Sequence, residues 1–140
     1  MRVKQLANRN HVNVDTVRHY TRIGLLTPTS DPINNYKDYS LADEQRLQFI
    51  VQAKSLGFSL SDIQLIINES QQGNSPCQKV RKIMQQRLAE TKRKIDAMQQ
   101  TYNKMKNATN RWQSLPDCVP TGHHVCHLIE DLNNGGEQSV

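Results

Sequence analysis

The feature that most constrains this chain is a heptad pattern in its second half. Bulky residues there recur at alternating steps of four and three, a spacing typical of a helix that buries one seam against another helix. A helix from about residue 76 to about residue 113 has roughly 38 residues and is about 57 Å long. No other segment is long enough to pair with it inside the chain, so the pattern predicts a homodimer. The seam positions are Met84, Leu88, Thr91, Ile95, Met98, Tyr102, Met105, Thr109 and Trp112.

The composition agrees with a chain that buries surface against a partner. Of its 140 residues, 36% are hydrophobic and 5% are aromatic, which suits an elongated or oligomeric protein better than one with a large single core. The sequence has neither an apolar run long enough to span a membrane nor an apolar signal region. We therefore expect a cytoplasmic protein without a membrane partner. In that reducing compartment, its three cysteines point to metal binding or reactivity rather than to disulfides.

Basic residues are concentrated in two parts of the chain. Residues 1–40 carry six Lys/Arg against three Asp/Glu, and residues 71–116 carry ten against two. Residues 117–140 carry four Asp/Glu and no Lys/Arg. A basic body favours a polyanionic partner, usually nucleic acid. A solvated helix surface explains residues 71–116 equally well.

The first 70 residues divide into short predicted helices. One covers residues 3–8, and the next begins after the expected cap Asn13 and ends at Gly24. After several turn-forming residues, helices are predicted over residues 41–56, closed by Gly57, and onward from a cap at Ser59. Residues 36–39 between them fit a small wing. The expected apolar faces comprise Val3, Leu6 and Ala7, then Val14, Val17 and Tyr20, then Leu60, Ile63, Ile66 and Ile67.

The first two helices, joined by a tight turn at Asn10-His11, form a possible helix-turn-helix. In that motif the second helix lies in the major groove of DNA. Arg18 can bond a guanine edge or clamp a phosphate, while Thr16 and Tyr20 can donate to phosphates. The same spacing also occurs in packing hairpins. The positions expected to be exposed are Asp15, Thr16, Arg18, His19 and Arg22.

A cysteine loop follows the long predicted helix. Cys118 and Cys126 flank seven residues that include His123 and His124. Thiolate and imidazole are the usual ligands of Zn²⁺ and its heavier relatives. Buried cysteines with solvated histidines are the alternative. A third thiol, Cys77, lies in the first turn of the long helix, where backbone N–H groups and the helix dipole favour its thiolate form.

Helix geometry decides how Cys77 relates to this loop. It lies on the seam, 41 residues before Cys118, or about 60 Å along a helix, so one chain cannot bring the two to one metal ion. In a parallel dimer Cys77 would face only its twin. In an antiparallel dimer crossing near residues 97–98, it would meet residues 117–118 of the other chain. The predicted ligands are Cys118, Cys126, the partner's Cys77 and either His123 or His124.

Three runs in this sequence resemble motifs of the mercury-resistance-regulator (MerR) family. Residues 14–26 resemble its recognition helix, residues 35–40 its wing, and residues 54–63 its second helix pair. The resemblance implies a mostly α-helical chain with a winged helix-turn-helix head over residues 1–70 and a dimerisation helix, 71–114, in an antiparallel coiled coil. A metal-binding loop and short helix would occupy residues 115–132, with a disordered tail over 133–140.

The resemblance also implies which residues bind DNA. Two positions depart from the family pattern: Thr21 stands where the family usually has an acidic residue, and Lys37 where it usually has arginine. Lys37 keeps the charge but lacks the bidentate fork of a guanidinium. The expected DNA-binding residues are Thr16, Arg18, His19, Tyr20 and Arg22 of the recognition helix, with Tyr36, Lys37 and Tyr39 of the wing.

By the same resemblance the chain is a regulator, and Asp117, which stands where zinc sensors of the family often carry a further cysteine, could supply an oxygen ligand. A thiol or zinc enzyme would need an acid/base group near an open metal position, and no motif places Asp117 or Glu130 in that role. Divalent-metal sensors of the family carry a cysteine matching Cys77, whereas copper(I) sensors lack it. The implied protein represses without metal, and it activates its promoter with RNA polymerase by distorting the DNA when zinc, cadmium or lead binds. The spacing between Cys118 and Cys126 also occurs in copper sensors, so a copper(I)-responsive regulator stays open. So do a regulator that responds to thiol oxidation and a structural zinc.

Overall fold

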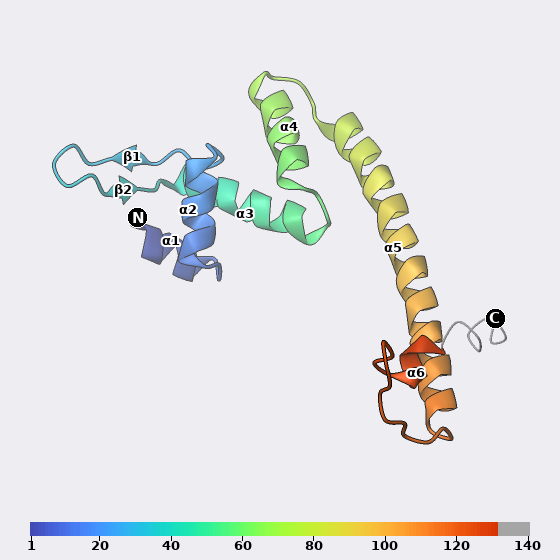
Figure 1. Cartoon of the computed structure of the whole chain (residues 1–140). Coiled ribbons are helices and arrows are strands. Elements are labelled where there is room, and N and C mark those ends of the chain that lie inside the picture. The colour runs from blue at the N-terminus through green and yellow to red at the C-terminus, as the bar shows by residue number, and fades with distance from the viewer. Residues whose placement is uncertain (132–140) are drawn as a thin grey trace. The chain divides into compact units, whose positions relative to one another are not determined.

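The computed structural model describes residues 1–131, so Leu132 and the predicted tail over 133–140 lie outside the described residues. The described chain divides into two compact units, one spanning Met1–Arg87 and one beginning at Leu88. The predicted mostly α-helical class is confirmed (Figure 1). The elements in chain order are α1 (Val3–Arg9), α2 (Val14–Arg22), β1 (Thr29–Ser30), β2 (Lys37–Asp38), α3 (Leu41–Ser55), α4 (Leu60–Gln71), α5 (Cys77–Trp112) and α6 (His127–Glu130).

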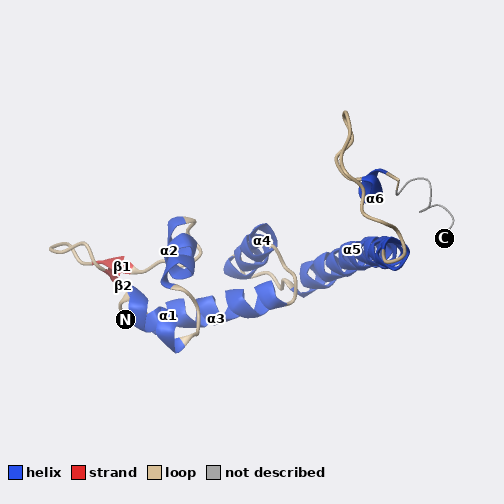
Figure 2. Ribbon diagram, turned by 60° about the horizontal axis from the view of Figure 1, so that its bottom comes forward, coloured by secondary structure: helices blue, strands red, loops and turns tan. Residues whose placement is uncertain are grey.

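In the first unit, α1 and α2 pack against each other beside one end of α3, as both ribbon views show (Figures 1 and 2). The turn between them contains His11 at a φ of 55°, and Gly24, at a φ of 83°, follows the end of α2. Asn13 occupies the N-cap position of α2, but its side chain makes no capping hydrogen bond there, contrary to our expectation. The core that these helices share with α3 and α4 includes Leu6, Ala7, Val17, Leu26, Leu47, Ile50 and Ile63.

The next two helices both begin with a capping box. Ser40 accepts from the Asp43 backbone N–H while the Asp43 carboxylate accepts from the Ser40 N–H, and Ser59 and Asp62 do the same at α4. Each box satisfies N–H groups that the first helical turn leaves without partners. Gly57, at a φ of 100°, lies in the turn between the two helices. The predicted cap at Ser59 and the stop at Gly57 are therefore confirmed.

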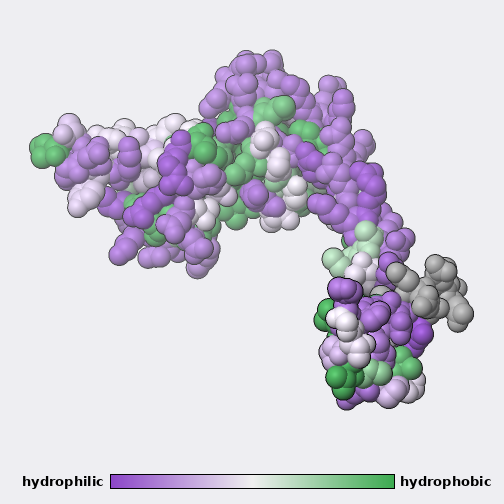
Figure 3. Space-filling model, in the orientation of Figure 1, coloured by the Kyte–Doolittle hydropathy of each residue, from purple (hydrophilic) through white to green (hydrophobic). Residues whose placement is uncertain are grey.

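The predicted wing is a two-stranded antiparallel hairpin. Thr29 pairs with Asp38, and Ser30 pairs with Lys37. The connecting loop is closed by backbone hydrogen bonds between residues 31 and 35–36. The space-filling view shows hydrophobic surface at the tip of this hairpin, where Ile33 is 95% exposed (Figure 3).

The long helix α5 begins one residue later than expected, after Pro76. The Ser75 hydroxyl accepts from the Cys77 N–H at 3.4 Å. In the first unit, residues 80, 83 and 84 pack against the core of the head. The Arg87 guanidinium donates to both carboxylate oxygens of Asp62, at 2.8 and 2.9 Å. The compact unit therefore extends beyond residue 70, the end of the predicted head.

Most of the heptad seam is exposed in the single chain. Five of its side chains in the second unit have exposed fractions between 56% and 69%, namely Leu88, Ile95, Met98, Tyr102 and Met105. Among the described residues no other helix approaches the length of α5. None of the helices over residues 1–131 is both long and apolar enough to cross a membrane. At the far end of α5, the Trp112 indole N–H donates to the Leu128 carbonyl at 3.1 Å and ties α6 to the helix.

Candidate nucleic-acid interface and metal centre

The exposed face of α2 carries three of the predicted DNA-binding side chains. Arg18, His19 and Arg22 are exposed, whereas Thr16 is half-buried. The Arg18 guanidinium lies 3.8 Å from the carboxylate of Asp15, which is one helical turn earlier, and both side chains are exposed to solvent. A pair so exposed contributes little to stability, so the guanidinium can exchange it for another anion.

The two predicted contacts Tyr20 and Tyr39 belong to the core of the head instead. Tyr20 is only 7% exposed, and burial raises the pKa of its hydroxyl. Tyr39 is 3% exposed, and its hydroxyl lies 2.7 Å from that of Thr21. The Thr21 hydroxyl donates to the Val17 carbonyl and can accept from the Tyr39 hydroxyl at the same time, so this departure from the family pattern joins the wing to α2. Both tyrosines were predicted to contact DNA, and the structure places their side chains in the core of the head.

The other two wing residues lie beside a basic cavity. Tyr36 and Lys37 line a cavity of about 410 Å³ together with Arg18 of α2. The Lys37 ammonium donates to the Ser30 hydroxyl at 2.9 Å, across the hairpin. Arg2, which our reading of the sequence did not single out, also lines this cavity, with its guanidinium carbon 4.8 Å from the centre of the Tyr36 ring.

In the second unit, part of the predicted metal-ligand set surrounds one cavity. Cys118, His124 and Cys126 all line a space of about 250 Å³ enclosed by the loop after α5. His123 and Asp117, both described residues, do not line it. Of the two histidines that the sequence left open, His124 is therefore the one placed with the cysteines.

Glu130, at the end of α6, holds this loop together. Its carboxylate lies 2.7 Å from Nδ1 of His124 and accepts from the backbone N–H groups of Val125 and Cys126. The Val125 N–H and then the His124 ring hold the pKa of Glu130 below its usual range. When a carboxylate holds Nδ1 of a histidine, the Nε2 atom is available to bind a metal ion. Metal-binding histidines commonly have such a carboxylate behind them.

His127 is a further imidazole that our reading of the sequence left out of the site. It lines the same cavity. Its Nε2 donates to the Pro116 carbonyl at 2.9 Å, which fastens α6 to the start of the loop. The Asp131 carboxylate lies 3.9 Å from its Nδ1. Both ring nitrogens thus face protein oxygens, so His127 supports the loop rather than offering a donor to the cavity.

The described part of one chain does not by itself assemble a metal centre. Over residues 1–131 no three His, Cys, Asp or Glu side chains are close enough together to hold an ion. All three cysteines are free thiols, with Cys77 and Cys118 exposed and Cys126 half-buried. The donor types fit a thiophilic ion, since two thiols and an imidazole line one cavity, but in the described residues these three are not close enough together to bind one ion.

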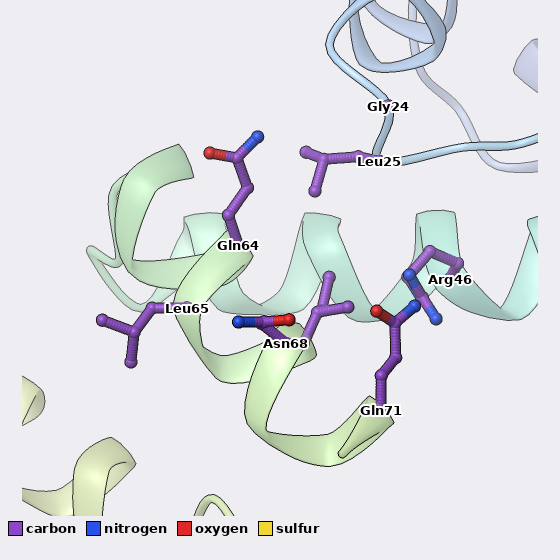
Figure 4. A pocket seen from close by; sticks show the side chains of 8 residues that line it. Gly24, Leu25, Arg46, Gln64, Leu65, Asn68 and Gln71 are labelled. Carbon is purple, nitrogen blue, oxygen red and sulfur yellow. The ribbon is translucent and has the colours of Figure 1, made fainter.

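A further cavity in the first unit has different chemistry. It has a volume of about 460 Å³ and lies among α3, α4 and the turn that follows α2. Figure 4 shows the amides of Gln64, Asn68 and Gln71 along α4, with Arg46 of α3 and Leu25 facing them. No thiol, imidazole or carboxylate lines it. This cavity therefore lacks the donors that a thiophilic metal requires.

The sequence matches two family models. Residues 1–70 match the MerR HTH family regulatory protein, and residues 44–108 match the family described as MerR, DNA binding. Together the two matches run from the first helix almost to the end of α5.

Individual relatives resemble the chain over most of its length. The HTH-type transcriptional regulator HmrR of Sinorhizobium medicae is 26% identical, with 97% of this chain and 88% of the relative covered. The HTH-type transcriptional regulator ZntR of Escherichia coli K12 is 28% identical, with 96% and 93% covered. The crystal structure of the transcription regulator PbrR691 from Ralstonia metallidurans, in complex with lead(II), has a TM-score of 0.71 at 21% identity, with 94% and 98% covered.

Proposed function

Because this chain belongs to the MerR family of helix-turn-helix DNA-binding regulators, which are not enzymes, we propose that it regulates transcription in response to a thiophilic divalent metal ion. The ion is most simply zinc, with cadmium or lead as alternatives. In this proposal a cytoplasmic homodimer binds promoter DNA, represses without metal, and activates transcription by RNA polymerase through DNA distortion when metal binds. Distortion of this kind requires a few kcal/mol.

The exposed face of α2 and the wing support the DNA-binding part of the proposal. Arg18 and Arg22 present guanidinium groups on one helix, and Lys37 adds an ammonium beside Arg18. Guanidinium and ammonium groups account for much of the contact that proteins make with DNA phosphates, while arginine also reads guanine. Thr16, His19 and Tyr36 complete the proposed contact set. Tyr20 and Tyr39 hold α2 and the wing in place from the core.

The observation that carries the metal-sensing part is the cavity shared by Cys118, Cys126 and His124. Thiolate sulfur is a soft donor and imidazole nitrogen also suits zinc, so this set favours Zn²⁺ and heavier ions over Mg²⁺ or Ca²⁺. One structural neighbour agrees with this chemistry, since PbrR691 was crystallised in complex with lead(II). A bound ion would supply a strong bond joining donors from different parts of the protein.

The exposed seam of α5 supports a ligand from a second chain. Antiparallel pairing of two α5 helices would cover the seam and bring Cys77 of the partner subunit to the loop. We therefore propose two equivalent sites per dimer, each with Cys118, Cys126, His124 and the partner's Cys77. Asp117 and His123 are second choices because neither lines the cavity. The proposed division of the chain is a DNA-binding head to residue 70, a dimerisation helix over 71–114 and a sensor loop from residue 115.

A promoter-reporter assay with a panel of metals tests the proposal. The reporter is the DNA upstream of the gene for this chain, and the strains carry wild type, Cys77→Ser, Cys118→Ser or Cys126→Ser. We expect induction by a divalent ion in wild type and its loss in all three variants. His123→Ala, which changes an imidazole outside the cavity, is the matched control and should keep the response.

Three results would redirect the proposal. Induction by copper(I) that Cys77→Ser does not affect would replace the divalent ion with a monovalent one. Induction by an oxidant in the presence of a metal chelator, lost in Cys77→Ser or Cys118→Ser, would point to a thiol-based sensor. Unfolding of the protein on metal removal, with no change in transcription, would leave only a structural zinc.

A further inference from the structure

The basic cavity between the wing and the first two helices is lined by two cationic residues, Arg2 and Lys4, that are not among the proposed DNA contacts. Four of its lining residues are cationic, namely Arg2, Lys4, Arg18 and Lys37. None of its lining residues is acidic. Like charges that face one cavity repel one another, and an anion that enters it relieves this repulsion. The cavity thus favours an anionic ligand.

The four cations come from three separate elements. Arg2 and Lys4 lie at the start of α1, Arg18 lies on α2, and Lys37 lies on the wing strand β2. The two ribbon views both show the N-terminus beside β2 (Figures 1 and 2). A single anion in the cavity would therefore be held by segments far apart in the sequence, which fixes its position more firmly than one side chain can.

Arg2 is already placed for such a ligand by an aromatic ring. Its guanidinium carbon lies 4.8 Å from the centre of the exposed Tyr36 ring, within the range of a cation–π interaction. The guanidinium carbon lies over the ring, and this contact uses none of its N–H groups as hydrogen-bond donors, so they can donate to an oxygen anion. Because the stack restrains a long side chain in advance, less conformational freedom is lost when the anion binds.

We propose that this cavity binds the phosphodiester backbone of DNA, and that Arg2 and Lys4 are direct phosphate contacts alongside Arg18 and Lys37. The inference rests on the proposed DNA-binding function and adds a phosphate site at the start of α1. A DNA backbone fits better than an isolated carboxylate because it presents a continuous row of negative charges to α1, α2 and the wing together. Contacts of this kind fix register and add affinity without reading the sequence.

The test measures binding to fluorescein-labelled mixed-sequence duplexes on the order of 20 base pairs, about two helical turns. The full-length protein is compared with Arg2→Ala, Lys4→Ala and the double variant by fluorescence anisotropy between about 50 and 200 mM salt. We expect each single variant to bind about three- to tenfold more weakly. The slope of log affinity against log salt should lose roughly one unit for each contact removed. Circular dichroism confirms that each variant is folded.

Two further variants separate this site from general loss of charge. Arg93→Ala removes an exposed arginine from the middle of α5, outside the cavity, and should keep the wild-type affinity and salt slope. Tyr36→Leu keeps all four cations but removes the ring under Arg2. Because the stack acts as a unit, Tyr36→Leu and Arg2→Ala together should weaken binding less than the product of their single effects.

The possible outcomes distinguish the inference from the function on which it rests. If wild type binds the duplex and the Arg2→Ala, Lys4→Ala double variant binds with the same affinity and salt slope, the phosphate site is wrong while DNA binding stands. The same conclusion follows if Arg93→Ala weakens binding as much as the Arg2→Ala, Lys4→Ala double variant does, because the loss would then reflect overall charge rather than the cavity. If wild type binds neither the duplex nor its own promoter DNA, both the function and this inference are overturned.

Discussion

The head and the sensor loop differ in where their side chains find partners. In the first unit, fourteen hydrophobic residues form one buried cluster. The buried carboxylate of Glu44 accepts hydrogen bonds from Arg9 and Asn10. In the second unit, Ala108 is the one buried hydrophobic residue among the described residues, and apolar side chains such as Ile129 remain exposed. The core side chains of the head thus find their packing and hydrogen-bond partners within the head. The long helix and the loop instead leave apolar surface that another molecule could cover.

This difference separates the part that holds the fold from the part that can respond. A core that is already closed gains little from a ligand, because its contacts are made whether or not the ligand is present. A loop held by a few hydrogen bonds around Glu130 and His127 is easily rearranged by a new strong bond. We therefore expect the stability of the fold to depend mainly on the first unit and metal binding to depend on the loop of the second.

The largest effect is expected from a cavity in the core of the head. Leu47 is fully buried, and Leu47→Ala should lower the free energy of unfolding by about 2–5 kcal/mol in urea denaturation. Ile129→Ala, at an exposed position of α6, should change it by less than about 0.5 kcal/mol. Equal losses in the two variants would show that the loop unit contributes as much to the fold as the head does.

Loss of a proposed ligand should affect metal binding without affecting the head. Cys126→Ser replaces a thiolate with a poor ligand for a soft ion, so zinc affinity in a chelator competition should fall by more than about 100-fold, since outer contacts alone contribute 10–100-fold. Urea denaturation without metal should be unchanged. Thr121→Ala, which alters another residue lining the cavity, is the control and should bind zinc like wild type. A Cys126→Ser protein with wild-type zinc affinity would remove the loop from the metal site.

The ion pair that joins α5 to the head should make stability depend on pH. The Arg87 guanidinium lowers the pKa of Asp62 to about 2 in the folded protein, below the ordinary value of 3.8. A lowered pKa stabilises the fold above the unfolded value, so this contribution is complete above about pH 4 and disappears as the pH falls through about 2. Asp62→Asn should lose about 1–2 kcal/mol at neutral pH and show a flatter acid dependence in urea denaturation.

The matched control for that ion pair is an exposed one in the second unit. Lys92 and Asp96, 2.9 Å apart on α5, are both open to solvent. Asp96→Asn should therefore lose at most about 0.5 kcal/mol. A loss in Asp62→Asn no greater than that in Asp96→Asn would contradict an anchoring role for the buried pair.

The smallest effect is expected from a residue that positions a ligand without binding the ion. Glu130→Gln weakens the hold on His124 Nδ1 and on two loop N–H groups, so zinc affinity should fall by about tenfold. Chelator competition measures it. Asp131→Asn, at a carboxylate that contacts only His127 at 3.9 Å in the described structure, should have no measurable effect. Wild-type affinity in Glu130→Gln would mean that His124 binds independently of this carboxylate.

Local patterns predicted much of the fold. Helix faces follow from apolar spacing, and the stops at Gly24 and Gly57 follow from residues that adopt positive φ without strain. The burial of Tyr20 and Tyr39 was harder to predict, because a tyrosine has both a ring that can pack and a hydroxyl that can face a ligand. The position of Tyr39 depends on a hydroxyl contact with Thr21, 18 residues earlier, and that of Tyr20 depends on packing in the core of the head.

The sequence predicted the metal-donor residues of the candidate site but not the residues that hold functional side chains in place. Two cysteines and two histidines in one loop indicate soft-metal chemistry by type and spacing alone. The role of Glu130 depends on how the loop turns back on α6, and that of Arg2 on the hairpin folding beside α1. The pairing of Asp62 with Arg87 links residues 25 positions apart on different helices. Such contacts depend on tertiary structure, which no local pattern specifies.

The uncovered seam of α5 has a consequence for protein dosage. In a site that two chains share, metal affinity and dimer affinity are thermodynamically linked, so each strengthens the other. At low copy number a protein with such a site would need more metal to respond, because part of the ion's binding energy would go into bringing two chains together. Expression level would then set the threshold of the response as directly as the ligands themselves.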